Sequence, residues 1–204
     1  MLYTATVAPN TLGLLIELMQ KPYLQEFNLV GGTALSLQIG HRISIDLDLF
    51  TIKAFDTNEL KSKLEDDYPV FQVLLESQNT LITTINDIKV DFIRFKYGFT
   101  YPIIIEKEIR LADIKDIAPM KLDAITGRGQ KKDFFDLYFL LKKYALPEMF
   151  DLYQAKYLHT TIFHVIKSIT YFQDADTEPD PVIIDKKVSW IKVKRKLTEE
   201  VKKL

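Results

Sequence analysis

The segment from Phe27 to Phe50 constrains this chain more than any other part of its sequence. An apolar run, Phe27–Val30, is followed by the two glycines Gly31 and Gly32, then by a helix-compatible stretch at residues 34–39 and an alternating run at residues 45–50. Short apolar runs are typical of buried strands, and alternation is typical of a strand with one buried face. The order predicts a strand, a tight turn, a helix and a second strand within 24 residues.

The second of these strands carries two carboxylates. Successive side chains on a strand point to opposite faces, so we expect Asp46 and Asp48 on one face and Ile45, Leu47 and Leu49 in the core. The two carboxylates would lie about 7 Å apart along the strand. Like charges this close repel, and a divalent cation would relieve the repulsion. Oxygen ligands alone suit Mg²⁺ or Mn²⁺ better than zinc.

The glycine turn upstream favours a phosphate ligand. Gly31 and Gly32 have no Cβ, so the backbone can approach a bound group closely. We expect Thr33 to cap the following helix, whose N-terminal N–H groups favour an anion. A phosphate-binding turn followed by two metal-binding carboxylates predicts a nucleoside triphosphate site. The alternative for Asp46 and Asp48 is a solvated strand face.

The stretch GGTALSLQIGHRISIDLDLF resembles the signature of the AbiEii/AbiGii toxin family, within the DNA polymerase β-like nucleotidyltransferase superfamily. The resemblance implies an α+β fold. A nucleotidyltransferase-type mixed β-sheet with flanking helices would occupy residues 1–110, and a helical C-terminal domain would occupy residues 111–204. The chain departs from the wider superfamily in having Gly-Gly-Thr for Gly-Ser, with thirteen residues between Gly32 and Asp46.

A third carboxylate, Asp91, lies in the strand-like run IKVDFIRF. Alternation puts it opposite the face of Val90 and Phe92, and an aspartate in an apolar strand is costly unless it is paired or binds a metal. The resemblance implies that Asp91 completes the metal site of Asp46 and Asp48 and takes the proton from the attacking hydroxyl. The alternatives are an edge-strand position or a salt bridge to Arg94 or Lys89.

A second block of charged residues follows in the helical half. The resemblance implies that this block contacts the nucleotide phosphates, and Lys and Arg suit a triphosphate as point charge and bidentate fork. The alternative is an ordinary helix surface with Lys–Asp pairs. The candidate nucleotide-binding residues are Gly31, Gly32, Thr33, Lys121, Arg128, Lys132 and Asp136, with Asp133 beside them.

The remaining sequence predicts helices at residues 9–20, 59–68, 113–144 (broken near residues 127–129), 146–172 and 185–204. It predicts strands at residues 70–75, 81–85, 88–95 and 101–106, and a loop at residues 174–183. We expect the helix at residues 59–68 to be capped by Thr57 or Asn58.

The histidine spacing does not favour a metal site, because His159 and His164 lie five residues apart, which suits shared ligation on a helix poorly. We expect them to be core or surface histidines. His41 is the one histidine near the glycine–aspartate segment, and with Arg42 it is interpreted as structural or close to the phosphates.

Composition excludes several classes of protein. The chain has no cysteine, so it contains neither disulfides nor thiolate metal sites. It has no apolar run of roughly 20 residues and lacks the order of a signal peptide, which predicts a cytoplasmic protein without a membrane partner. Net charge is −1, but residues 186–204 hold eight basic and two acidic residues. This segment is interpreted as a solvated helix face, with Val188, Ile191 and Leu197 as its apolar stripe, or alternatively as a contact to an RNA backbone.

The resemblance implies an enzyme that moves a nucleoside monophosphate from an NTP to an acceptor hydroxyl, with Mg²⁺ or Mn²⁺. It further implies a toxin with a separate antitoxin, and RNA (including a tRNA end) or protein as acceptor. Two alternatives stay open. One is a catalytically inactive module that binds nucleotide or a partner, and the other is a nucleotidyltransferase acting on a small molecule such as an antibiotic.

Overall fold

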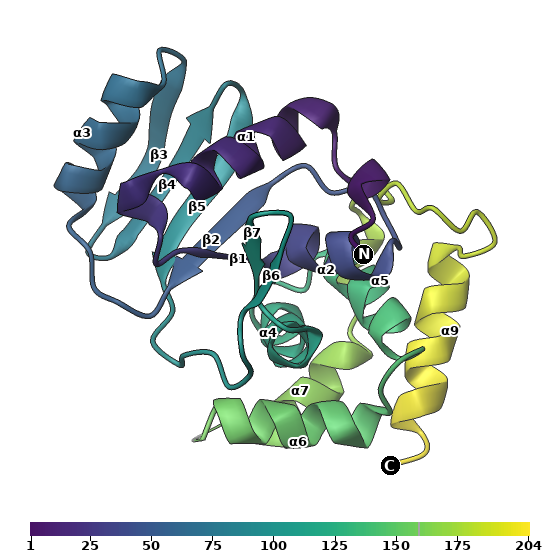
Figure 1. Ribbon diagram of the computed structural model, residues 1–204. Coiled ribbons are helices and arrows are strands. Elements are labelled where there is room, and N and C mark those ends of the chain that lie inside the picture. Colours follow the sequence, from purple (N-terminus) through teal and green to yellow (C-terminus); the bar gives the residue numbers. More distant parts are fainter. Residues whose placement is uncertain (159) are drawn as a thin grey trace. The chain divides into compact units, whose positions relative to one another are not determined.

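The computed structural model describes residues 1–158 and 160–204, which form two compact units. Residues Met1–Ile39 and Ser44–Asp113 make a sheet unit, and residues Gly40–Ile43 and Ile114–Leu204 make a helical unit (Figure 1). His159 lies outside the described residues, so its sequence-based interpretation is not addressed by the structure.

The sheet unit is built on seven strands in the order β3-β4-β5-β2-β1-β7-β6. The pairs β2–β5 and β1–β7 are parallel and the other pairs are antiparallel, so the sheet is mixed as expected. β5 is an interior strand between β4 and β2, which excludes the edge position considered for Asp91. The strands are β1 (Asn28–Val30), β2 (Leu47–Thr51), β3 (Phe71–Ser77), β4 (Thr80–Ile85), β5 (Ile88–Arg94), β6 (Ile104–Glu106) and β7 (Ile109–Leu111).

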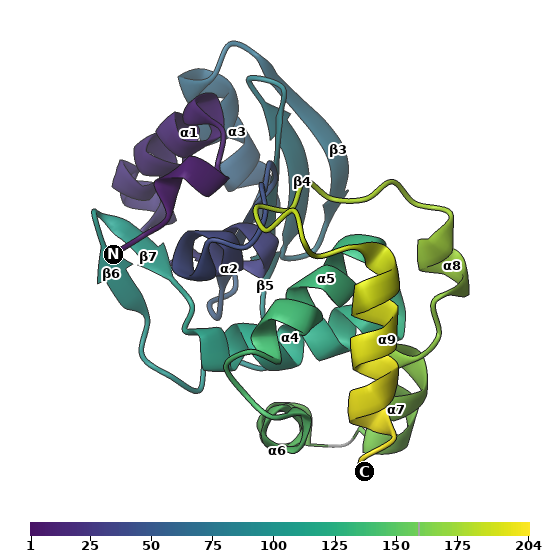
Figure 2. The same cartoon turned by 90° about the vertical axis from the view of Figure 1, so that its right-hand side faces the viewer.

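Alternation explains why the central strands fold as they do. Leu47 and Leu49 of β2 and Val90 and Phe92 of β5 are almost fully buried, and the register pairs Leu47 with Val90 and Leu49 with Phe92. These side chains share one face of the sheet. Helices α1 (Pro9–Gln20) and α3 (Thr57–Asp67) lie on the same side of strands β3–β5 (Figure 2). Short 3₁₀ turns, η1 (Thr4–Thr6) and η2 (Pro22–Leu24), flank α1.

Helix α3 begins where an aspartate satisfies its first N–H groups. The side chain of Asp56 accepts hydrogen bonds from the backbone N–H of Asn58 at 2.8 Å and of Glu59 at 3.2 Å. Asp56 is therefore the N-cap, and the prediction of Thr57 or Asn58 as the cap is wrong by one or two residues.

The helical unit contains the helix break that the sequence predicts near residues 127–129. After α4 ends, the N–H groups of Arg128 and Gly129 both donate to the carbonyl of Ala124, and Gly129 has a φ of +57°. Glycine adopts this left-handed conformation without a steric penalty, which explains the break. The helices are α4 (Ile114–Gly127), α5 (Lys131–Leu140), α6 (Leu146–Lys156), α7 (Ile162–Ile169), α8 (Gln173–Asp176) and α9 (Trp190–Val201).

Some sequence-based expectations about individual elements are wrong. Ile45 precedes β2, is 63% exposed and does not enter the core. Ile191 of α9 is 77% exposed, and the buried stripe of this helix is Val193 and Leu197. Helix α8, at residues 173–176, overlaps the start of the expected loop at residues 174–183, and β7 was not expected.

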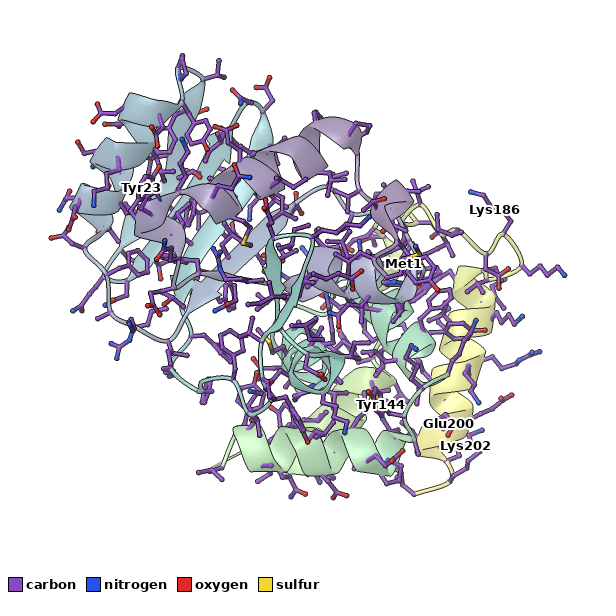
Figure 3. All side chains as sticks on the ribbon, in the orientation of Figure 1. Met1, Tyr23, Tyr144, Lys186, Glu200 and Lys202 are labelled. Atoms are coloured by element: carbon purple, nitrogen blue, oxygen red, sulfur yellow. The ribbon has the colours of Figure 1, made fainter. Side chains whose placement is uncertain are left out.

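The basic C-terminal segment is largely solvated. Lys186, in the segment before α9, and Lys202, after it, are both exposed (Figure 3). Part of the charge is paired, because Lys196 and Lys203 both reach Glu200. These contacts fit the solvated-face interpretation, and a contact to RNA stays a prediction.

Across residues 1–158 and 160–204, none of the helices combines the length and the apolar character that crossing a bilayer requires.

The cap of α3 provides a test of local stability. Asp56→Ala removes the acceptor for two N–H groups, so we expect the free energy of unfolding to fall by about 1 kcal/mol. Urea denaturation followed by circular dichroism measures this change. Asp56→Asn keeps a capping oxygen and is the control. An Asp56→Ala variant as stable as the wild type would contradict the capping role.

Candidate active site

The carboxylate of Asp48 lies directly against the backbone of Gly31. A Cβ placed on Gly31 would come within 2.0 Å of Asp48 Oδ2 and 2.8 Å of its Cγ. The antiparallel register of β1 and β2 produces this approach, because Asp48 pairs with Val30, the residue before the glycine. Gly31 also has a φ of +68°, in the left-handed region. Glycine is therefore required at position 31 for space and for backbone conformation.

Asp91 lies beside Asp48 on the neighbouring strand. The parallel register of β2 and β5 pairs Asp48 with Asp91, so the two side chains project from the same face of the sheet. The expectation that these two aspartates occupy adjacent strands is confirmed. Lys89 Nζ lies 2.5 Å from each carboxylate oxygen of Asp91, which is the salt bridge considered as an alternative.

Asp46 precedes β2 instead of lying within it. Its backbone carbonyl accepts a hydrogen bond from the Thr33 hydroxyl, which also lies 2.8 Å from Ser44 Oγ. Thr33 is buried inside α2 (Gly31–Ile39), so the prediction that it caps this helix is wrong. Its hydroxyl instead fixes the segment that leads into β2.

The donor set suits a hard divalent cation, although the side chains are not gathered around one point. Among residues 1–158 and 160–204, no three His, Cys, Asp or Glu side chains are close enough together to hold a metal. Asp48 and Asp91 supply oxygen donors on paired positions, and the Lys89 ammonium on Asp91 shows that this carboxylate accepts a cationic neighbour. The Lys89 side chain is 40% exposed, so it has room to leave. Binding by Asp46, Asp48 and Asp91 stays a prediction.

The second charged block forms ion pairs inside the helical unit. Lys121 Nζ lies 2.8 Å from Asp133 Oδ1 and 2.6 Å from Asp136 Oδ2. Arg128 donates from Nε and Nη2 to the two oxygens of Asp133. Lys121 is buried, whereas the Arg128 side chain is 53% exposed. Lys121 and Arg128 therefore converge on one carboxylate, that of Asp133.

Asp136 collects further partners from residues 40–43. Arg42 donates from Nε to Oδ1 at 2.6 Å and from Nη2 to Oδ2 at 3.0 Å, and His41 Nε2 lies 2.7 Å from Oδ1. Asp136 has no exposed surface, so its predicted contact with nucleotide would act through the cations around it. The structural interpretation of His41 and Arg42 is confirmed. Lys132, the remaining candidate of this block, is half-buried on α5.

The electrostatics of this buried cluster favour charged aspartates and a neutral histidine. Burial opposes ionisation of Asp136, but Arg42 and Lys121 outweigh it and hold its pKa well below the ordinary value. Burial likewise opposes ionisation of Asp133, and Lys121 and Arg128 lower its pKa. Burial lowers the pKa of His41 in spite of the hydrogen bond to Asp136. A neutral His41 donates from Nε2, which leaves its buried Nδ1 as an acceptor with no hydrogen-bond partner in the described structure.

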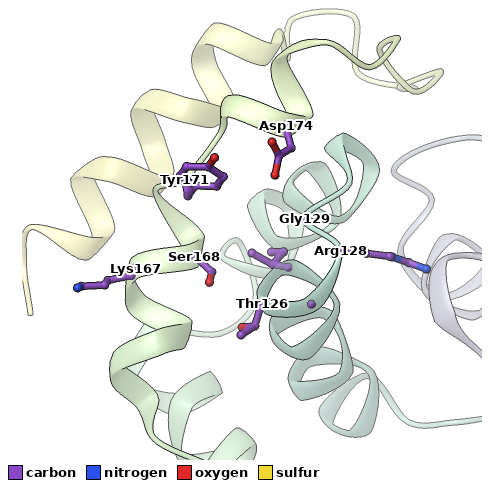
Figure 4. Close-up of a pocket in the computed structure, with 9 residues that line it drawn as sticks. Thr126, Arg128, Gly129, Lys167, Ser168, Tyr171 and Asp174 are labelled. Atoms are coloured by element: carbon purple, nitrogen blue, oxygen red, sulfur yellow. The ribbon is translucent and has the colours of Figure 1, made fainter.

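A cavity of about 300 Å³ lies elsewhere in the helical unit. It is lined by the end of α4, the glycine break, α7 and α8, with Thr126, Ser168, Tyr171 and Asp174 as polar groups (Figure 4). The Arg128 side chain points away from Ser168 and Tyr171 in this view, consistent with its pairing to Asp133. No sequence pattern predicted this cavity.

The structure thus gathers the predicted site residues into two groups. The sheet unit contains Gly31, Gly32, Thr33, Asp46, Asp48 and Asp91, whereas the helical unit contains Lys121, Arg128, Lys132 and Asp136. Sequence reasoning missed the contact between Gly31 and Asp48, because it depends on the register of two strands. That both groups hold one nucleotide stays a prediction.

The fold is that of nucleotidyltransferases. A candidate nucleotidyltransferase from H. pylori matches with a TM-score of 0.56 and 19% identity, covering 97% of each chain. JHP933 from Helicobacter pylori matches with a TM-score of 0.54 and 17% identity, over 97% of this chain and 94% of that one. MenT4, a nucleotidyltransferase toxin from Mycobacterium tuberculosis H37Rv, matches with a TM-score of 0.50 and 14% identity, over 88% and 76%.

Sequence similarity then gives the family. Residues 13–107 match the family described as nucleotidyl transferase AbiEii toxin, type IV toxin–antitoxin system. An uncharacterised protein of Aquifex aeolicus (strain VF5), aq_aa25, is 39% identical over 163 residues, which are 75% of this chain and 77% of that protein. The chain belongs to the AbiEii nucleotidyltransferase toxin family. The matched region contains the glycine–aspartate segment and Asp91 and ends before Lys121.

The contact between Gly31 and Asp48 predicts a non-additive pair of substitutions. Gly31→Ala should lower the free energy of unfolding by at least about 2 kcal/mol, because the methyl group meets Asp48 and the backbone is left-handed. In an Asp48→Ala background the clash with the carboxylate disappears and only the tight contact with the Cβ of residue 48, at 3.2 Å, is left. About 1–2 kcal/mol should then remain, mainly from the backbone. Urea denaturation of the two single variants and the double variant measures this coupling.

Gly13 is the matched control for Gly31. It lies in α1, and a Cβ there would meet nothing within 4 Å. Gly13→Ala should therefore stabilise the chain by about 0.5–1 kcal/mol. Equal destabilisation by Gly31→Ala with and without Asp48 would contradict the proposed steric role of the glycine.

The buried histidine predicts a pH dependence of stability. Because its folded pKa lies below the unfolded value of about 6.5, the unfolded chain binds a proton first as pH falls, and stability declines below about pH 7. His41 contributes at most about 1.4 kcal/mol per pH unit to this slope. His41→Gln should flatten the decline between pH 7 and 5, measured by urea denaturation. An unchanged slope would show that His41 does not titrate in this range.

Asp133 and Asp136 also lower the free energy of unfolding as pH falls, but at lower pH than His41 does. Their folded pKa values lie below the unfolded value of about 3.9, so their contribution is complete above that pH and is lost as pH falls through the folded values. The two effects are therefore separated along the pH axis.

Proposed function

We propose that this chain is an active, metal-dependent nucleotidyltransferase that moves a nucleoside monophosphate from an NTP to an acceptor hydroxyl. The observation that carries the proposal is the pairing of Asp48 with Asp91 on adjacent strands, with the Asp48 carboxylate packed against the glycine turn. Membership of a nucleotidyltransferase toxin family supports the same activity.

Asp46, Asp48 and Asp91 would hold the metal through carboxylate oxygens. Mg²⁺ or Mn²⁺ fits such ligands. When bound, the cation would supply positive charge that offsets the charge developing on the leaving group. Lys89 would release Asp91 when the cation and the substrate enter. Its half-exposed side chain supports this exchange.

The residues around the metal would align a single displacement. The acceptor oxygen forms a bond to the α-phosphorus while the bond from that phosphorus to the bridging oxygen breaks, and pyrophosphate leaves with the electron pair. Asp91 takes the proton of the acceptor hydroxyl. Gly31, Gly32 and Thr33 cradle the β and γ phosphates through backbone N–H groups.

The cationic block would neutralise the rest of the triphosphate. In this proposal Lys121, Arg128 and Lys132 lie near the phosphates, and Asp136 orients Lys121 and Arg42. Arg128 is the best placed of the cations to contact a ligand, because half of its side chain is exposed. Residues 1–110 act as the nucleotidyltransferase core and residues 111–204 as a helical domain.

The toxin–antitoxin family supports a cognate antitoxin protein as partner. RNA, including a tRNA end, or a protein is the acceptor, and the cytoplasm is the expected location. The identity of the NTP is open to direct measurement with the four labelled nucleotides.

The activity is tested by incubating the protein with labelled NTPs, Mg²⁺ and total cellular RNA or lysate, and asking which molecule acquires label. Asp48→Ala should reduce transfer on the order of 100-fold or more while the far-ultraviolet circular dichroism is retained. Asp66→Ala, at an exposed position of α3, is the matched control and should keep full transfer. Undiminished transfer by Asp48→Ala would exclude the proposed metal role.

The ion pair between Lys89 and Asp91 favours one competing function, nucleotide binding without turnover. Isothermal titration with NTP and Mg²⁺, followed by a pyrophosphate-release assay, separates the two. Binding without release in the presence of every cellular fraction would favour the binding module, and release that depends on Asp48 would favour the enzyme.

A further inference from the structure

A group of aromatic side chains lies where β2 and β5 end. The rings of Phe50 and Phe95 have centroids 5.8 Å apart, and Phe95 also contacts Tyr97 at 5.7 Å and Phe99 at 5.9 Å. Phe50 is the penultimate residue of β2, and the other three rings follow β5 within five residues. All four belong to the sheet unit. We call Phe50, Phe95, Tyr97 and Phe99, with the cation Lys96, the aromatic–basic surface.

Of the four rings, one is buried and three are partly exposed. Phe95 is buried and anchors the group, whereas Tyr97 is 46% exposed and Phe50 and Phe99 are half-buried. A turn closed by the N–H of Gly98 on the carbonyl of Phe95 keeps Tyr97 at the surface, and Gly98 has a φ of +70°. Tyr97 therefore presents part of its ring to a possible stacking partner.

The charged residues in the segment that carries three of these rings are both positive. The run from Ile93 to Tyr101 is IRFKYGFTY, with two cations, four aromatic residues and no aspartate or glutamate. Arg94 projects from the opposite face of β5, because it pairs with Thr51 whereas Ile93 pairs with Phe50. Lys96 is exposed, and its Nζ lies 5.2 Å from the centre of the Tyr97 ring. In a chain of net charge −1, this local composition favours an anionic ligand that also has flat faces.

The aromatic–basic surface adjoins the candidate active site. Phe50 follows Asp48 by two residues on β2 and therefore lies on the same face, about 7 Å along the strand. On the neighbouring strand β5, Asp91 and Ile93 lie on this same face, because Asp48 pairs with Asp91 and Phe50 pairs with Ile93. A molecule lying on Phe50 and Tyr97 would extend toward the aspartates.

Single-stranded nucleic acid has the matching chemistry. Its bases stack on aromatic rings and its phosphates bind cations, whatever the sequence. A peptide with an apolar side chain could use the rings but would leave Lys96 without an anionic partner. An acidic peptide could pair with Lys96 but would gain nothing from the rings. The combination of both features favours a nucleotide chain.

We propose that the aromatic–basic surface stacks an unpaired base near the end of a single-stranded RNA and binds the adjoining phosphate. The proposal rests on the function proposed above, and it selects RNA from the acceptor classes given there. The end of the bound strand would direct its hydroxyl toward Asp91.

The test uses binding without chemistry. The probe is a fluorescently labelled single-stranded RNA oligonucleotide with a 3′-deoxy end, mixed with the full chain without NTP or metal, and binding is followed by anisotropy. Tyr97→Ala should weaken binding about 10-fold, and Tyr97→Trp should restore it because stacking needs only a ring. Tyr3→Ala, at another exposed tyrosine of the sheet unit, is the control and should bind as the wild type does.

The cation contribution has its own readout. Lys96→Ala should weaken binding and reduce the slope of log affinity against log salt by about 0.7. Lys63→Ala is the matched control, because Lys63 of α3 carries the same charge away from this surface. Its Nζ also lies near a tyrosine ring, 5.6 Å from the centre of the Tyr23 ring. An unchanged slope for Lys96→Ala would overturn the phosphate contact.

The outcomes separate this proposal from the enzymatic one. Equal RNA affinity for Tyr97→Ala and wild type, or no RNA binding by the wild type, overturns the surface even if labelled transfer occurs. Loss of labelling of a protein acceptor in Tyr97→Ala without any RNA binding assigns the surface to protein and overturns RNA. Ring-dependent RNA binding with no transfer of label to any acceptor supports the surface and counts against the enzyme.

Discussion

The contact on which the sheet unit depends most is that of the Asp48 carboxylate with the backbone of Gly31. A carboxylate packed on a main chain at this distance leaves no room for a side chain, and it fixes how β1 and β2 can pair. The same pairing aligns Asp48 with Asp91 through β5. One close approach therefore determines the glycine, the positive φ that follows the first strand, and the face on which the two acids meet.

The buried charges of the helical unit stabilise it in a different way. Arg42 and Lys121 offset Asp133 and Asp136, and all four are nearly inaccessible to solvent. Removing one member of such a group leaves an uncompensated charge and typically costs about 3–5 kcal/mol, although the intact group itself adds little net stability. The cluster therefore acts mainly to define which residues can be neighbours. This constraint explains why candidate phosphate ligands are found in contact with protein carboxylates.

Local patterns predicted the elements better than their contacts. Alternation gave β4 and β5, and the glycines near residue 128 marked the break between α4 and α5. The same alternation failed for Ile45, because β2 begins two residues later and the pattern holds only within a strand. Threonine is a residue type that often caps helices, yet the Thr33 hydroxyl donates a hydrogen bond to the backbone carbonyl of Asp46. The pairing of Lys121 and Asp136 requires two helices to pack, which sequence spacing alone does not specify.

The short segment Gly40–Ile43 has a topological consequence. It lies between α2 and β2 along the chain, yet it belongs to the helical unit, where Arg42 forms an isolated bridge with Ile183 and the Ile43 N–H donates to Val182. The polypeptide thus leaves the sheet unit, contributes four residues to the other unit and returns before the final crossing after Asp113. Proteolysis near residue 113 could not yield two intact halves, because the C-terminal fragment would lack the guanidinium that neutralises Asp136.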